Sequence, residues 1–131
     1  MRKVFFSSLL IWALGLACER GVGEAVEAGI VEVEAWLKAG EVVAVDVNVE
    51  EVREEYGVLP GAVLLGTASG YGAGLLPREK GRKLVFYCLN KRCTASHIAA
   101  KRAKGLGHKN TYIMSEGIQA WKEAGLPTAP P

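Results

Sequence analysis

Two short apolar runs constrain the fold of this chain more than any other feature. Residues 42–47 are apolar on both alternating faces except for Asp46, and residues 84–87 are suited to a buried strand. Such runs are typical of parallel strands that helices cover on both sides. Because helical patterns follow both runs, the sequence predicts an α/β layer fold with a parallel sheet.

The second run leads directly into Cys88. The loop after it carries two cations, Lys91 and Arg92, and a second cysteine, Cys93, and an alanine-rich helical pattern begins just beyond Thr94. A loop that turns from the end of a parallel strand into a helix start gathers backbone N–H groups, which favour negative charge. This setting favours the thiolate form of a cysteine, so the sequence predicts that Cys88 is nucleophilic.

The N-terminal segment has the pattern of an export signal. Residues 1–3 include two cations, residues 4–14 are mainly apolar, and Gly15 and Ala17 provide small residues at the positions that a signal peptidase reads. We therefore predict a signal peptide over residues 1–17 and a periplasmic or cell-envelope location; the alternative is an amphipathic first helix of the domain. The residues around Cys18 are similar to a bacterial lipobox, so acylation of Cys18 would tether the domain to a membrane.

The remaining chain divides into a tether, one domain and a tail. Residues 18–29 are rich in glycine and charge and are predicted to be a tether, and residues 128–131 a flexible tail. Inside the domain, residues 30–127, glycines and prolines separate the periodic segments. We expect strands over residues 30–33, 42–47, 62–65, 83–87 and 110–114, a helical turn over residues 34–38, and helices over residues 50–56, from about 95 to 104, and 117–124. The helix over residues 50–56 should have Asn48 as its N-cap and stop at Gly57.

Charge is distributed unevenly over the predicted mature chain. Loss of residues 1–17 leaves fourteen basic and fourteen acidic residues. Residues 18–79 hold four basic and twelve acidic residues, and residues 80–131 hold ten basic and two acidic. A positive field around the cysteine loop would draw a small anion to Cys88. Nucleic acid is not an expected partner, because the net charge is zero and no basic patch is interleaved with aromatic residues.

The order of these features is similar to that of a single-domain rhodanese. The similarity runs through residues 43–47, 59–62, 85–88 and 117–127, and covers about residues 30–127. It implies a five-stranded parallel sheet with helices on both faces. It also implies a sulfurtransferase whose cysteine takes sulfane sulfur from a small anion such as thiosulfate, or from a persulfide, and passes it to a thiol or cyanide.

By position, the resemblance makes Cys88 the persulfide-forming cysteine. The loop whose amides would surround it consists of Leu89, Asn90, Lys91, Arg92, Cys93 and Thr94. The resemblance implies neither a metal nor a cofactor. The loop departs from the family, since Lys91 stands in place of a glycine and Cys93 in place of an arginine.

Other interpretations of the cysteines stay open. Cys88 and Cys93 can pair in an oxidising compartment and act as a thiol redox switch. Cys88, Cys93 and His97 can also be imagined as metal ligands, although no fourth ligand is evident. Finally, Cys88 can be an inert buried thiol, or the domain a non-catalytic binding module.

Overall fold

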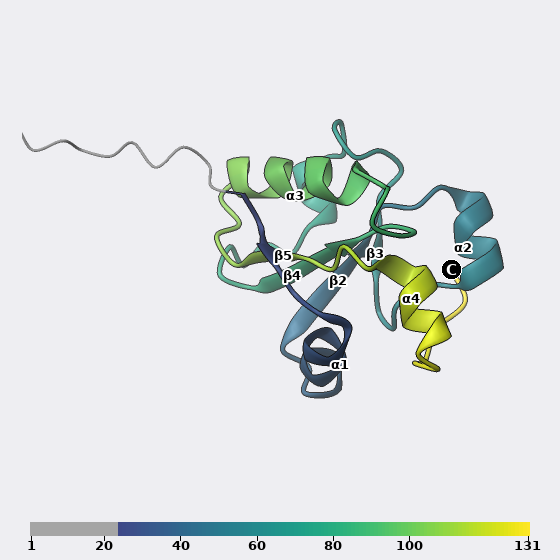
Figure 1. Cartoon of the computed structure of the whole chain (residues 1–131). Coiled ribbons are helices and arrows are strands. Elements are labelled where there is room, and N and C mark those ends of the chain that lie inside the picture. The colour runs from purple at the N-terminus through teal and green to yellow at the C-terminus, as the bar shows by residue number, and fades with distance from the viewer. Residues whose placement is uncertain (1–23) are drawn as a thin grey trace, which may run out of the picture.

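The computed structural model describes residues 24–131 as an open parallel sheet covered by helices (Figure 1). The elements, in chain order, are β1 (Val26–Glu27), α1 (Ile30–Lys38), β2 (Val42–Asp46), α2 (Glu50–Tyr56), β3 (Val63–Leu64), the 3-10 turn η1 (Ala73–Leu75), β4 (Lys83–Tyr87), α3 (Ala95–Gly105), β5 (Thr111–Ile113) and α4 (Gly117–Glu123). The strand order is β1-β5-β4-β2-β3, and every pairing is parallel. This confirms the five-stranded α/β fold that the resemblance implies.

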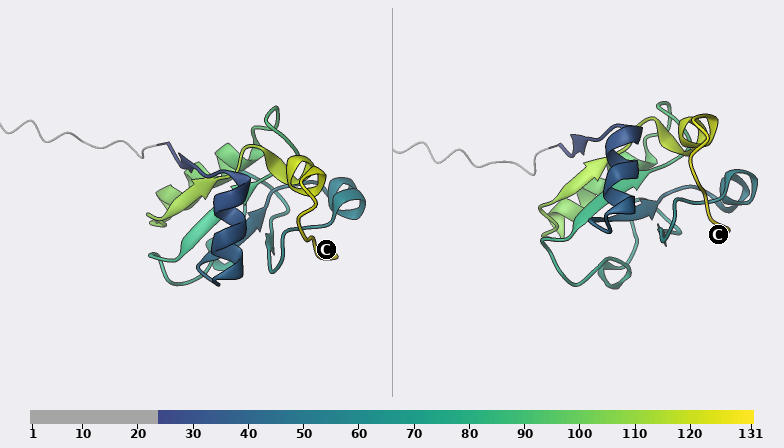
Figure 2. Two further views of the ribbon diagram at one scale, coloured as in Figure 1. Left: turned by 60° about the horizontal axis from the view of Figure 1, so that its bottom comes forward. Right: turned by 90° about the horizontal axis from the view of Figure 1, so that it is seen from below.

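Hydrophobic cores lie on both faces of the sheet. Along β4, Leu84 and Phe86 point into the core that α3 covers, whereas Val85 and Tyr87 point into the core that holds Trp121 of α4. Figures 1 and 2 show α3 on one face and α1 with α4 on the other. Because both faces are buried, residues 84–87 of β4 are all apolar, and this part of the strand shows no alternation of polar and apolar residues.

The two strands that anchor the sequence prediction are neighbours in the middle of the sheet. β2 pairs with β4 along their full lengths, from Val42 opposite Lys83 to Asp46 opposite Tyr87. The pairing continues one step further, since Val47 N–H donates to the carbonyl of Tyr87 at 3.0 Å. The carboxyl ends of β2 and β4 therefore meet at one edge, and Cys88 follows there.

The prediction of a strand over residues 30–33 is wrong. These residues begin α1, in which Val33 is fully buried while Val31 is exposed. The run from Ile30 to Val33 alternates like a strand over four residues, but a helix also places positions i and i+3 on one face. The first strand is instead Val26–Glu27, which pairs with β5, so this part of the predicted tether belongs to the sheet.

The helix over residues 50–56 and its end at Gly57 are confirmed, but its predicted N-cap is not. Gly57 has φ +76°, in the left-handed region, and the N-cap residue is Val49 rather than Asn48. Asn48 is buried, and its N–H donates to Asp46 Oδ1 at 2.8 Å. It therefore belongs to the end of β2 rather than to the helix start.

Arg53 of α2 holds the carboxyl ends of β2 and β3 together. Its Nε donates to the buried Asp46 Oδ1 at 2.9 Å. Its Nη2 donates to the carbonyls of Asp46 at 3.1 Å and Leu65 at 2.7 Å. One side chain thus neutralises a buried carboxylate and joins the ends of both strands, which gives Asp46 a structural role.

The C-terminal segment is held against the domain, in contrast to the flexible tail predicted over residues 128–131. Val58 N–H donates to the carbonyl of Ala129 at 2.9 Å, and Ala129 N–H donates back at 2.8 Å. Just before it, Trp121 Nε1 donates to the carbonyl of Pro127 at 2.9 Å. These backbone hydrogen bonds are not visible in a proline-rich sequence.

The predictions for the N-terminus lie mostly outside the described residues. The residues that lie outside the described range are the predicted signal peptide over residues 1–17, Cys18, and residues 19–23 of the predicted tether. Within residues 24–131, no helix is long and apolar enough to cross a membrane.

Candidate active site

The edge where β2 and β4 end is the point at which the chain connections diverge. The chain leaves β4 through α3 to β5 on one side, and it leaves β2 through α2 to β3 on the other. In open parallel sheets, ligands bind in the crevice outside the carboxyl ends of strands at such a divergence. Cys88 is the first residue after β4 and lies where these connections diverge.

Cys88 is almost completely buried and is joined to Cys93 by a disulfide. Only 2% of Cys88 is exposed, whereas Cys93 is half-buried. The two Cα atoms are 6.4 Å apart, within the usual range for a disulfide. Ser96 Oγ, in the first turn of α3, lies 3.5 Å from Cys88 Sγ. The structure therefore describes the oxidised loop, in which Cys93 and α3 cover the sulfur of Cys88.

Asn90 shapes the loop between the two cysteines. Its Oδ1 accepts the N–H of Arg92 at 3.0 Å, and its carbonyl accepts the N–H of Cys93 at 3.1 Å. These bonds turn the chain back, which brings Cys93 over Cys88. Two of the loop amides are thus engaged inside the loop, while the first amides of α3 have no acceptor within that helix.

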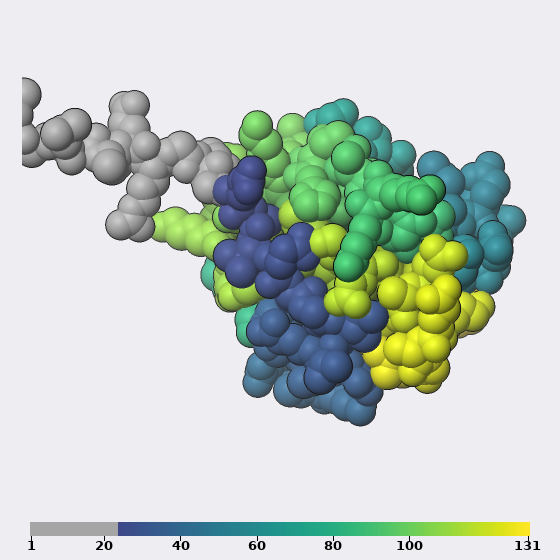
Figure 3. Space-filling view, viewed as in Figure 1, coloured from purple at the N-terminus to yellow at the C-terminus, as the bar shows by residue number. Residues whose placement is uncertain are grey.

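The start of α4 fixes the first two residues of the loop. Ile118 N–H donates to the carbonyl of Cys88 at 2.9 Å, and Gln119 N–H donates to the carbonyl of Leu89 at 3.1 Å. In the space-filling view, the green segment after β4 lies against the yellow surface of α4 (Figure 3). The contact is close because Gly117 has φ +76° and no side chain; a Cβ there would lie 2.3 Å from the carbonyl oxygen of Leu89.

Gly117→Ala is therefore expected to lower the free energy of unfolding by about 3 kcal/mol or more, through left-handed strain and a backbone clash. Gly40→Ala is the matched control, since Gly40 has φ +68° but nothing within 4 Å of the added Cβ. It should cost about 1–2 kcal/mol. If urea denaturation gives the same loss of unfolding free energy for both variants, the close contact between Leu89 and Gly117 does not affect stability.

The charge around the loop is mixed rather than uniformly positive. Lys91 and Arg92 are exposed, and they line a shallow hollow together with Glu116 and Glu123 of the α4 region. These are the two acidic residues of the basic C-terminal segment, and the fold brings both to the loop. Asn90 Nδ2 donates to Gln119 Oε1 at 3.3 Å in the same region. An approaching anion therefore meets two mobile cations with carboxylates close by.

The model of the rhodanese-like domain matches residues 30–124, which is most of the chain. The chain belongs to the rhodanese-like domain family. No curated protein sequence matches it. The matched segment runs from α1 to the end of α4.

Solved structures share this fold. The protein RPA3614 of Rhodopseudomonas palustris, of unknown function and described as a possible tyrosine phosphatase, is 26% identical; the match covers 80% of this chain and 85% of that one, with TM-score 0.64. The human single-domain sulfurtransferase TSTD1 is 20% identical, with coverage of 76% and 96% and TM-score 0.61. The Saccharomyces cerevisiae single-domain sulfurtransferase RDL2 is 16% identical, with coverage of 80% and 94% and TM-score 0.62.

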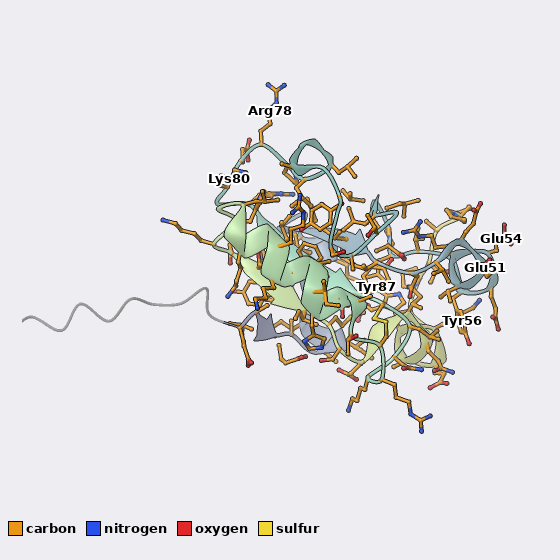
Figure 4. The ribbon with its side chains drawn as sticks, turned by 90° about the horizontal axis from the view of Figure 1, so that it is seen from above. Glu51, Glu54, Tyr56, Arg78, Lys80 and Tyr87 are labelled. Carbon is orange, nitrogen blue, oxygen red and sulfur yellow. A yellow bond between two sulfur atoms is a disulfide. The ribbon has the colours of Figure 1, made fainter. Side chains whose placement is uncertain are left out.

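Tyr87, the residue before Cys88, is held by the segment that precedes β3. Its hydroxyl accepts the N–H of Leu59 at 2.9 Å, and the side chain is fully buried. Burial raises the pKa of Tyr87 far above its ordinary value, and the Asp46 carboxylate raises it further. Tyr87 thus remains a neutral phenol. Figure 4 shows it in the interior, on the side of the domain that carries Glu51 and Glu54 of α2.

The alternative metal site of Cys88, Cys93 and His97 does not assemble in the rhodanese-like domain. α3 begins at Ala95, so Cys93 and His97 are not one turn apart on a helix. Within residues 24–131, no group of three or more His, Cys, Asp or Glu side chains is arranged to hold a metal ion.

The other histidine, His108, is buried beside Lys80, and its Nε2 lies 3.4 Å from Lys80 Nζ. Burial and the charge of Lys80 lower the pKa of His108. Lys80 lies at the opposite end of the domain from α2 (Figure 4).

The sequence predicts that residues 88–94 form one loop, but that prediction does not include three other residues that shape the site. Ser96 touches the cysteine sulfur, Gly117 permits the approach of α4, and Glu116 adds negative charge. The contact of Ser96 could have been predicted, because a serine at the start of a helix that follows Cys88 lies near the cysteine. The other two arise from tertiary packing, which no local pattern indicates.

Ser96→Ala should slow the reaction of reduced Cys88 with a sulfur donor about tenfold, because a hydrogen bond to a charged group contributes about 1.5 kcal/mol. Ser69→Ala, at an exposed position, is the matched control. Stopped-flow measurement of donor consumption gives both rates. Identical rates for Ser96→Ala and the wild type would exclude a role for this hydroxyl.

Proposed function

We propose that this rhodanese-like domain is a sulfurtransferase that carries sulfane sulfur on Cys88. The observation that carries the proposal is the position of Cys88, which is the first residue after the central strand β4, where the connections from β4 and β2 diverge. Its sulfur lies beside Ser96 in the first turn of α3. Membership of the rhodanese-like family and the fold shared with two single-domain sulfurtransferases support the same chemistry.

In the proposed reaction the reduced Cys88 thiolate attacks the outer sulfur of thiosulfate. The sulfur–sulfur bond of thiosulfate breaks, sulfite leaves with the bonding electron pair, and Cys88 holds a persulfide. Cyanide or a thiolate then attacks the outer persulfide sulfur and regenerates the Cys88 thiolate. Free amides at the start of α3 stabilise the sulfur anion, and Lys91 or Arg92 attracts the sulfite oxygens.

The protein would act in the periplasm or cell envelope, after removal of residues 1–17. Acylation of Cys18 would tether it to the membrane through the residues that precede β1. Globomycin-sensitive processing in a bacterial host, followed by mass spectrometry of the mature N-terminus, distinguishes a lipid-modified Cys18 from simple cleavage.

Thiocyanate formation from thiosulfate and cyanide tests the proposed activity. Protein that has been reduced and then freed of reductant should form thiocyanate in its first turnover when cyanide is in excess, and Cys88→Ser should form none above the uncatalysed rate. Cys18→Ser is the matched control, because it removes the cysteine outside the domain, and it should behave like the wild type. Equal rates for wild type and Cys88→Ser would refute the proposal.

The Cys88–Cys93 disulfide favours a second candidate, a thiol redox switch. In that case the pair would cycle between dithiol and disulfide without any sulfur donor. Alkylation of free thiols in intact cells, before and after oxidative stress, would reveal the cycle. A switch and no thiocyanate formation would establish this candidate over sulfur transfer.

A further inference from the structure

We infer that Cys93 is a resolving nucleophile, which converts the Cys88 persulfide into the loop disulfide and releases hydrosulfide. This rests on the proposed sulfur transfer to Cys88 and names its acceptor, which is the thiol of Cys93 in the same chain. The domain then becomes a dithiol-dependent reductase of sulfane sulfur rather than a carrier that waits for an external acceptor.

The first support is the geometry of the loop. The disulfide shows that Cys93 Sγ reaches Cys88 Sγ while the surrounding backbone hydrogen bonds are intact. Asn90 holds this arrangement through the N–H groups of Arg92 and Cys93. The N–H groups of Ile118 and Gln119 hold the other end of the loop at Cys88 and Leu89. The fold therefore brings the two sulfurs together from both ends of a short loop.

The second support is the burial of Cys88. Only 2% of Cys88 is exposed, and Cys93 lies against its sulfur. Attack on Cys88 Sγ itself is therefore open to Cys93 rather than to a thiol from solution. Two groups joined by a short chain segment meet at an effective concentration of about a millimolar or more. An acceptor inside the loop therefore has an advantage over a dilute thiol or cyanide in solution.

The step balances without any added oxidant. The Cys93 thiolate attacks Cys88 Sγ, the bond from Cys88 Sγ to the outer sulfur breaks, and the outer sulfur leaves as hydrosulfide with the electron pair and a proton. The sulfane sulfur of the persulfide is reduced to hydrosulfide, and the two cysteines are oxidised to a disulfide. Thiosulfate thus yields sulfite and hydrosulfide at the cost of two thiols.

A further turnover then needs a dithiol reductant, either a small molecule or a protein. Cys93 is the more exposed partner of the disulfide, so attack by the reductant falls on Cys93 Sγ and frees the Cys88 thiolate. The exposed loop residues around it, Lys91, Arg92 and Thr94, make this side of the disulfide accessible.

A single-turnover reaction tests the inference. Full-length protein is reduced, freed of reductant under anaerobic conditions and mixed with equimolar thiosulfate, without any other thiol. Sulfite and hydrosulfide should appear in equal amounts, and the protein mass should fall by about 2 Da as the disulfide forms. Without thiosulfate, the mass should stay that of the reduced protein.

Cys93→Ser should release sulfite but no hydrosulfide, and it should keep a stable mass increase of about 32 Da. Cys18→Ser should match the wild type, which excludes a contribution from that thiol. Wild-type protein that releases sulfite and keeps the added sulfur would overturn the inference and leave the proposed function standing. Absence of sulfite would overturn both, and disulfide formation without thiosulfate would identify simple oxidation.

Discussion

Protein with Cys88 and Cys93 paired should form no thiocyanate from thiosulfate and excess cyanide. Prior reduction should raise the initial rate, measured before Cys93 re-forms the disulfide, by about a hundredfold or more. The disulfide removes the nucleophile that attacks thiosulfate, because a sulfur in a disulfide is not a thiolate. The effect is large because the catalytic atom itself is blocked, rather than a group that assists it. Initial rates measured before and after reduction and desalting provide the comparison.

Cys93→Ser isolates the disulfide from other effects of reduction. This variant cannot form the loop disulfide, so its rate should be the same before and after reductant treatment. If the oxidised wild-type protein were as active as the reduced protein, with the disulfide verified by intact mass, the reaction would not use the Cys88 thiolate.

Arg53→Met should lower the free energy of unfolding by about 3–5 kcal/mol, which is a large part of the stability of a domain of this size. Asp46 is fully buried, and its only ion pair within residues 24–131 is with Arg53. Loss of the guanidinium leaves that carboxylate uncompensated and also removes the donors to the carbonyls of Asp46 and Leu65. Urea denaturation followed by tryptophan fluorescence measures the change.

Two variants separate the buried charge from the loss of a long side chain. Arg82→Met removes a guanidinium whose Nη2 donates to the carbonyl of Gly40 at 3.1 Å in an exposed place, and it should cost less than about 1 kcal/mol. Asp46→Asn combined with Arg53→Met should recover part of the loss, because the unpaired charge is gone. If Arg53→Met and Arg82→Met lower the free energy of unfolding by the same amount, the buried ion pair does not stabilise the fold.

The central part of the fold could be predicted because its signals are local. Residues 42–45 and 84–87 are apolar on both faces, a pattern typical of a short parallel strand that is covered on both sides. Gly57 ends a helix by its left-handed backbone, a property of the residue itself. Cys88 could be placed at the edge of the sheet because it follows a strand directly.

The parts that failed depend on contacts between distant segments. Residues 30–33 fit both a strand and a helix, and the outcome depends on which residues Val33 packs against. Pairing of Ala129 with Val58 depends on the path of the chain after α4. The charge of the site was predicted from totals along the chain, whereas the fold brings Glu116 and Glu123 to the cysteine loop.

The destination of the transferred sulfur tests the central claim most directly. Reduced Cys93→Ser, in which the sulfur cannot be released by resolution, is treated with thiosulfate that carries an isotopic label on its outer sulfur. Peptide mapping should place the label on Cys88, and added cyanide should remove it as labelled thiocyanate. Label on another residue, or release of labelled thiocyanate while Cys88 stays unlabelled throughout, would contradict the proposal that Cys88 carries the sulfur.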